Sequence, residues 1–155
     1  MPKNSRRAAT RSVSSPIYVL VGPFADPARL SEWAHSEFRE SAAVAFIGVD
    51  RGFENLLESG LPPTLGIGDM DGILDPAKLK GPDDVPMIIL KREKERSDLA
   101  IALEFCVERR AQFVYAFGFQ GHRADHDYAV HLDLSEASRK IGRVVSVGEK
   151  GATFY

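Results

Sequence analysis

The chain has 155 residues, of which 44% are hydrophobic and 27% are charged, and its single cysteine is Cys106. This composition is typical of one globular domain and excludes collagen-like, coiled-coil, disordered and membrane-spanning proteins, while a lone cysteine favours a reducing compartment such as the cytoplasm. The formal net charge is −2, but residues 1–15 carry four cations and no acid, so the remaining 140 residues sum to −6, which argues against nucleic acid as a partner.

Residues 1–15 are basic and rich in serine, and we expect them to form a disordered tail outside the fold. Six short apolar runs rich in β-branched residues follow this tail. Several of them are continuous rather than alternating, which is typical of strands that are buried on both faces of a parallel sheet. The six expected strands are residues 17–21, 44–49, 64–67, 87–90, 113–117 and 144–147.

The segments between these runs have the spacing of amphipathic helices. The expected helices cover residues 27–38, 52–59, 97–107 and 124–140, and residues 146–155 are expected to begin a β-hairpin that turns at 149–151. Strands that alternate with helices predict an α/β domain. We therefore expect a Rossmann-like, three-layer fold, with a mostly parallel sheet of about six strands flanked by helices and ending in the start of a hairpin.

Polar residues follow the expected strands at the points where the strands end. Asp50 follows the second strand, Asp69 and Asp71 the third, and a charged run from Lys91 to Asp98 the fourth. In a parallel sheet all the carboxyl ends meet at one edge, where ligands bind. Carboxylates, cations and glycines gathered at one edge predict a site for phosphates and a divalent metal.

Asp69 and Asp71 give the sharpest signal. Two residues apart in an extended segment, their side chains point the same way, and Gly68 and Gly72 beside them allow a ligand to approach closely. A hard cation with phosphate oxygens would relieve the repulsion between the carboxylates. The alternative is a turn in which the aspartates cap backbone groups.

The run before the third helix offers both anion and metal contacts. Ser97 is an expected N-cap, and the helix N-terminus carries partial positive charge. Asp98 therefore either satisfies the helix dipole or belongs to the metal site. Lys94 is the cation that we expect to reach phosphate, although the whole run could be a solvated charged surface.

The segment 118–126 combines glycines with a cluster of polar side chains. Arg123 could clamp a phosphate with its planar fork of donors, and His126 beside Asp125 could act as a base, as an orienting group or as a structural histidine. His122 and His126 could share a helix face as zinc ligands, but this alternative lacks a third ligand.

Four motifs in this order resemble the catalytic domain of thiamine pyrophosphokinases. They are VDRGFE at 49–54, PTLGIGDMDG at 63–72, KERSD at 94–98 and GFQGHRADH at 118–126. The resemblance implies Mg²⁺-dependent transfer of a diphosphoryl group from ATP to the hydroxyl of thiamine, giving thiamine diphosphate and AMP. It implies catalytic roles for Asp50, Asp71, Asp98 and Asp125, nucleotide contacts from Gly68, Lys94, Ser97, Gly121, Arg123 and His126, and magnesium ligands Asp69, Asp71 and Asp98.

The chain's main departures from this family's pattern are Arg51, Glu54 and Val130, which replace Gly, Asn and Asn, whereas Glu95 and Ser97 are milder changes. Family members also carry a C-terminal β-sandwich domain that completes the thiamine pocket across a homodimer. We accordingly expect a catalytic domain at 16–147 and the start of a truncated or missing β-domain at 148–155. The sequence is then either part of a longer protein or a one-domain relative with another acceptor.

Two other functions are compatible with the motifs. The segment DMDGIL at 69–74 is similar to the signature of haloacid-dehalogenase-type phosphohydrolases, in which Asp69 would be a nucleophile. The three main departures instead favour a non-catalytic nucleotide-binding or regulatory relative.

Overall fold

The computed structural model describes residues 16–40, 42–69, 85–92 and 95–155. These residues form one sheet with the strand order β4-β3-β2-β1-β5-β6-β7, in which every pair is parallel except β6 with β7. The elements are β1 (Ile17–Val21), α1 (Pro27–Glu37), β2 (Val44–Val49), α2 (Gly52–Glu58), β3 (Pro63–Gly68), β4 (Met87–Ile89), α3 (Asp98–Glu108), β5 (Phe113–Phe117), α4 (Ala124–Ser138), β6 (Arg143–Gly148) and β7 (Gly151–Phe154).

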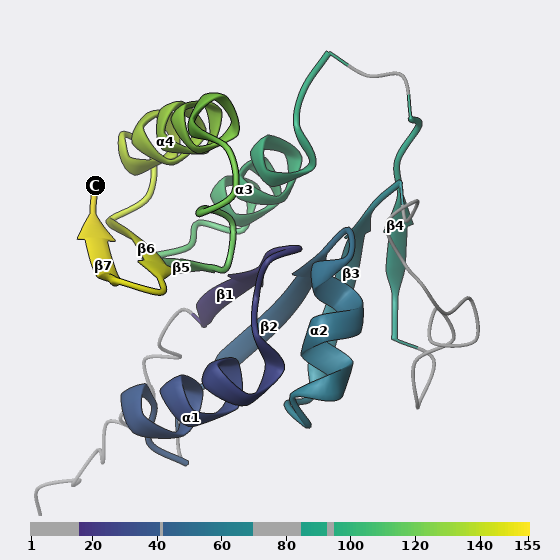
Figure 1. Cartoon of the computed structure of the whole chain (residues 1–155), viewed down its shortest axis with the longest axis vertical. Coiled ribbons are helices and arrows are strands. Elements are labelled where there is room, and N and C mark those ends of the chain that lie inside the picture. Colours follow the sequence, from purple (N-terminus) through teal and green to yellow (C-terminus); the bar gives the residue numbers. More distant parts are fainter. Residues whose placement is uncertain (1–15, 41, 70–84, 93–94) are drawn as a thin grey trace, which may run out of the picture.

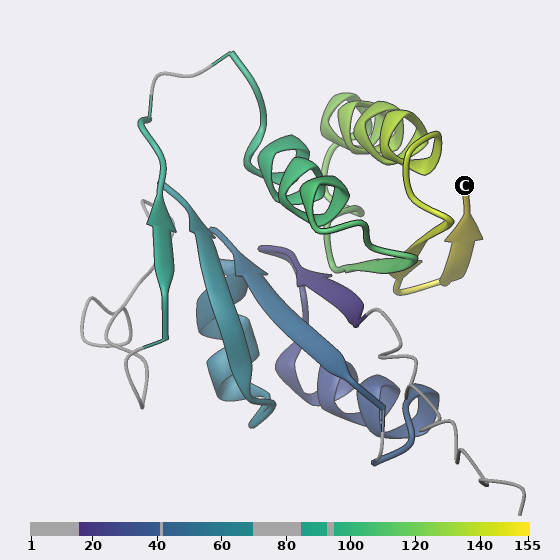
Figure 2. The same ribbon diagram turned by 180° about the vertical axis from the view of Figure 1, so that it is seen from behind.

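Helices cover both faces of the sheet, which confirms the predicted α/β architecture. Helices α1 and α2 lie on one face, and α3 and α4 lie side by side on the other (Figures 1 and 2). Within β1, Val19 and Val21 pack toward α1 and α2, whereas Tyr18 and Leu20 pack toward α3 and α4. Both sets are buried, which explains why the strand sequence is continuously apolar.

Most element boundaries agree with the prediction to within two residues, and β1, β2 and β5 agree at both ends. The expected hairpin forms as β6 and β7, and β7 adds a seventh strand to the same sheet. The expected tail at residues 1–15 lies outside the described residues, and the domain boundary after residue 147 stays a prediction. Among the residues that the structure describes, no helix combines the length and apolar character needed to cross a lipid bilayer.

Cys106 is buried on the sheet-facing side of α3, and this burial raises the pKa of its thiol to about 12. The thiol is therefore protonated at pH 8 as well as shielded from solvent, and reagents that need an exposed thiolate should not modify it. We expect native protein at pH 8 to resist iodoacetamide and denatured protein to take up one label per chain, as measured by mass spectrometry. Rapid labelling of the native protein would contradict this placement.

Candidate active site

Three aspartates meet at the edge formed by the carboxyl ends of the strands. Asp50 follows β2, Asp69 follows β3, and Asp98 is the first residue of α3. One carboxylate oxygen of each lies within 4.8 Å of those of the other two, and all three residues are half-buried. The fold thus brings together acidic groups from three separate segments of the chain.

Asp50 is held in its place by an unusual backbone conformation. Its φ is +52°, in the left-handed region, and its N–H donates to the carbonyl of Ile67 at 2.7 Å. Gly68 permits this close approach, because a Cβ at that position would lie 2.9 Å from the Cα of Asp50. A left-handed non-glycine residue costs about 1–2 kcal/mol, and such strain is concentrated at functional sites.

Asp98 is positioned by the cap of α3. The Oγ of Ser97 accepts a hydrogen bond from the backbone N–H of Ala100 at 2.9 Å, as predicted for an N-cap. The same hydroxyl donates to Oδ2 of Asp133 on α4 at 2.6 Å. Asp98 therefore occupies a fixed first helical turn, where the helix dipole favours a negative charge.

This cluster overlaps with the predicted metal ligands but is not identical to them. Asp69 and Asp98 lie together as expected, whereas Asp71 and the predicted phosphate contact Lys94 lie outside the described residues. The third carboxylate is that of Asp50, for which the family resemblance implied a catalytic role and not metal binding. Its position at the end of a parallel strand was the signal that could have assigned it to the cluster.

The donor set fits a hard divalent cation. Mg²⁺ binds oxygen ligands at about 2.0–2.1 Å in an octahedron, so two ligand oxygens are about 2.9 Å apart at adjacent positions and about 4.2 Å apart at opposite ones. The three carboxylate oxygens, which lie within 4.8 Å of one another, would move closer together to reach one such ion. Carboxylates from the two strand ends and α3 could thus hold Mg²⁺ together with phosphate oxygens.

A cavity of about 200 Å³ lies beside the cluster, with Asp50 and Asp98 in its wall. The rest of its lining is mostly apolar and comes from the loops after β1 and β5, the end of β2, the start of α3 and α4. Since an apolar cavity of about 150 Å³ can hold benzene, this one has room for a ring-sized group. Its other lining residues are Pro23, Val49, Ser97, Leu99, Phe119, His126, Ala129, Val130 and Asp133.

The glycine-containing loop before α4 packs tightly against the rest of the site. Gly118 has a φ of +75°, and a Cβ there would lie 2.4 Å from the Cα of Ala25. The N–H of Gly121 donates to Oδ1 of Asp127 at 2.9 Å, and Nε2 of His126 lies 3.1 Å from the carbonyl oxygen of Phe119. These contacts place His126 in the cavity wall as an oriented histidine.

Arg123 and Asp125 lie at the start of α4 and do not line this cavity. The guanidinium donates through Nε to Oδ1 of Asp125 at 3.0 Å and through Nη2 to Oδ2 at 2.5 Å. The hydrogen bonds from Arg123 lower the pKa of the Asp125 carboxyl. Both side chains are exposed, so a phosphate could reach Arg123 from solvent.

The zinc alternative gains no support from the described part of the chain. His122 packs its ring against Phe24 at a centroid distance of 4.1 Å, and His126 is engaged with the carbonyl of Phe119. The carboxylate trio is the group of potential ligands that the described residues bring together.

A family model of the thiamin pyrophosphokinase catalytic domain matches residues 38–145, which is more than half of the chain. The chain belongs to the thiamin pyrophosphokinase family. This finding confirms the resemblance carried by the four motifs and gives no support to the dehalogenase alternative.

Relatives within the thiamin pyrophosphokinase family agree with this assignment. The thiamine pyrophosphokinase of Bacillus subtilis (strain 168) is 34% identical over 82 residues, which are 52% of this chain and 38% of that protein. The thiamin pyrophosphokinase structure from Geobacillus thermodenitrificans is 29% identical with a TM-score of 0.64, covering 84% of this chain and 59% of that one. The Bacillus subtilis structure, at 22% identity and a TM-score of 0.68, covers 86% and 61% and supports the fold alone.

The chain thus spans less than two thirds of the length of these relatives. Two of the three main departures from the thiamin pyrophosphokinase pattern are buried: Glu54 is 5% exposed and Val130 is 3% exposed. Val130 lines the cavity beside the carboxylates and makes its wall more apolar than the family asparagine would. Arg51, the third departure, is exposed at the start of α2.

Proposed function

We propose that this chain supplies the ATP- and metal-binding part of a thiamine pyrophosphokinase, which transfers a diphosphoryl group from ATP to the hydroxyl of thiamine. The observation that carries the proposal is the convergence of Asp50, Asp69 and Asp98 at the sheet edge. The names of the matched family and of its relatives supply the reaction.

Asp50, Asp69 and Asp98 would hold Mg²⁺, with Asp71 as a further ligand outside the described residues. When bound, the ion neutralises charge on the triphosphate, which is the main requirement of phosphoryl-group chemistry. Arg123 at the start of α4 would add positive charge, as would Lys94, which lies outside the described residues.

The chain's own residues then position the reacting groups. The hydroxyl oxygen of thiamine forms a bond to the β-phosphorus of ATP, and the bond from that phosphorus to the oxygen bridging it to the α-phosphorus breaks, so AMP leaves. The mostly apolar lining of the cavity beside Asp50 and Asp98 offers few hydrogen-bond partners to water, which would otherwise compete as the acceptor. The hydroxyl proton leaves toward the acidic edge of the site, where Asp50 lies.

The direct test is to incubate the chain with ATP, Mg²⁺ and thiamine and to measure AMP and thiamine diphosphate by chromatography, with EDTA as the control. Equal amounts of both products, formed only with the metal, would support the proposal. Calorimetric binding of Mg-ATP without AMP would instead identify a non-catalytic nucleotide-binding relative, for which Arg51, Glu54 and Val130 are the motivation. Inorganic phosphate release through a phosphorylated Asp69 would identify a phosphohydrolase.

Replacing Arg123 by alanine should weaken Mg-ATP binding by at most about 3 kcal/mol, because one charge-assisted hydrogen bond contributes about 1.5–3 kcal/mol. Titration calorimetry measures this change. Arg139→Ala is the matched control, since Arg139 is an exposed cation at the other end of α4. Equal affinities of the Arg123 and Arg139 variants would remove Arg123 from the proposed site.

A further inference from the structure

We infer that Asp133 is a positioning residue of the metal site, which holds the first turn of α3 so that Asp98 faces Asp50 and Asp69. The inference rests on the proposed function, because it takes the carboxylate cluster to be the metal site. No motif in the sequence marked Asp133, and its role follows from contacts between two helices.

The structure ties Asp133 to the cap of α3 through one hydroxyl group. Oδ2 of Asp133 accepts a hydrogen bond from Ser97 Oγ at 2.6 Å, and that Oγ accepts from the N–H of Ala100 at 2.9 Å. A serine hydroxyl has a single proton and can rotate. The carboxylate fixes the direction of that proton and leaves an oxygen lone pair for the helix cap.

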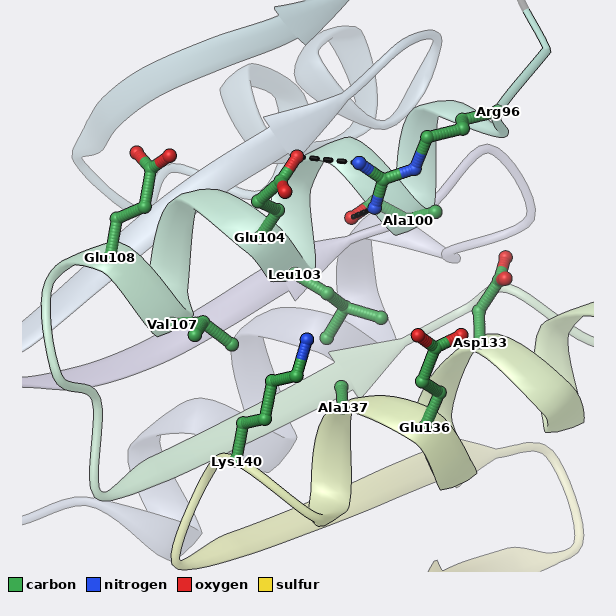
Figure 3. A pocket seen from close by; sticks show the side chains of 10 residues that line it. All are labelled: Arg96, Ala100, Leu103, Glu104, Val107, Glu108, Asp133, Glu136, Ala137 and Lys140. Carbon is green, nitrogen blue, oxygen red and sulfur yellow. Dashed lines mark hydrogen bonds and ion pairs between the residues drawn. The ribbon is translucent and has the colours of Figure 1, made fainter.

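The neighbouring acids of the groove between α3 and α4 are placed differently. Figure 3 shows this groove, with Asp133 on α4 beside the first turn of α3. Glu104 accepts a hydrogen bond from Arg96 at 2.6 Å, and Glu136, one helical turn beyond Asp133, is exposed. Asp133 is half-buried and also borders the cavity that contains Asp50 and Asp98.

Metal affinity depends on this arrangement, because Asp98 directly follows the capping serine. Without Asp133 the Ser97 hydroxyl loses its partner and the first turn of α3 loosens. The Asp98 carboxylate then spends less time close to the carboxylates of Asp50 and Asp69. Outer partners that orient metal ligands typically change metal affinity by about 10–100-fold when they are removed.

The test is a titration of the 155-residue chain with Mn²⁺, a paramagnetic substitute for Mg²⁺, in which electron paramagnetic resonance measures free ion. Asp133→Ala should weaken Mn²⁺ binding about tenfold. Asp133→Asn keeps an acceptor oxygen for Ser97 and should stay closer to wild type than to the alanine variant. Glu136→Ala, the matched control on the same helix, should leave the affinity unchanged.

A second pair of variants tests the same contact from α3. Ser97→Ala should also weaken Mn²⁺ binding. Adding Asp133→Ala to it should cause little further loss of Mn²⁺ affinity, because both substitutions remove the same hydrogen bond between Ser97 and Asp133. This comparison keeps the inference falsifiable if circular dichroism finds that Asp133→Ala alone is unfolded, since Asp133→Asn and Ser97→Ala then decide it.

Four results would overturn the inference. A lower melting temperature of Asp133→Ala with unchanged Mn²⁺ affinity would make the residue merely structural. Equal losses in the asparagine and alanine variants would mean that charge matters rather than the hydrogen bond, and full additivity with Ser97→Ala would mean that the two act separately. Failure of the wild-type chain to bind Mn²⁺ would overturn the proposed metal site itself, and the inference with it.

Discussion

Replacing Asp98 by asparagine is expected to abolish metal-dependent behaviour of the chain while leaving its fold intact. The substitution keeps the size of the side chain but removes one of three converging carboxylates. Because losing an outer partner alone costs about 10–100-fold in metal affinity, losing a ligand should cost at least about 100-fold. Mn²⁺ titration measures the affinity, and circular dichroism checks the fold.

Glu104→Gln is the matched control for this experiment. It removes one negative charge from the same helix, but Glu104 pairs with Arg96 and lies outside the carboxylate cluster. We expect it to bind Mn²⁺ as the wild type does. If Asp98→Asn retained wild-type affinity, the metal would have to bind elsewhere and the proposed function would lose its main support.

Replacing Gly52 by alanine should produce the largest loss of stability. Gly52 begins α2 directly after the Asp50 turn, and a Cβ there would lie 1.9 Å from the carbonyl oxygen of Val21 on β1. Since both partners are backbone, the helix or the strand must move, and overpacking of this kind costs up to about 3 kcal/mol and occasionally more. The free energy of unfolding in urea measures the loss.

Gly148→Ala is the comparison, because a Cβ at Gly148 meets its nearest atom at 3.9 Å, an ordinary contact. Its stability should stay within about 0.5 kcal/mol of wild type. Gly52→Ala should also weaken Mn²⁺ binding, since movement of α2 displaces Asp50. Equal stability of the two variants would show that α2 packs against β1 less closely than described here.

The sheet could be predicted from the sequence because its strands carry their own signal. Residues of β1 and β2 are apolar in continuous runs, and this pattern is typical of strands that are covered on both faces. The N-cap of α3 was equally readable, because Ser97 precedes an apolar helical stripe. Strand hydrophobicity and helix caps depend on residues that are close together in the sequence, and they therefore predict the positions of strands and helices well.

The membership of the carboxylate cluster was harder to predict, because it depends on how neighbouring loops fold over the sheet edge. Asp69 and Asp71 attracted attention by their spacing, yet Asp50 reaches the cluster through a left-handed turn that Gly68 makes room for. The position of Asp50 at the end of a parallel strand places it at this edge, but the local sequence does not report how closely the turn after β2 approaches Gly68. The hydrogen bond from Ser97 to Asp133 is likewise a tertiary contact, between two residues that are 36 positions apart in sequence.

The carboxylates that approach one another at the sheet edge come from three separate segments, two strand ends and the start of α3, and this has a consequence for stability. An ion bound there would link the ends of β2 and β3 to α3. The unfolded chain does not hold these three carboxylates together and so has no equivalent binding site. A ligand that binds only the native state raises the melting temperature with its concentration. Thermal-shift screening of nucleotides and alcohols in the presence of Mg²⁺ therefore offers a way to identify the acceptor without an assay for its product.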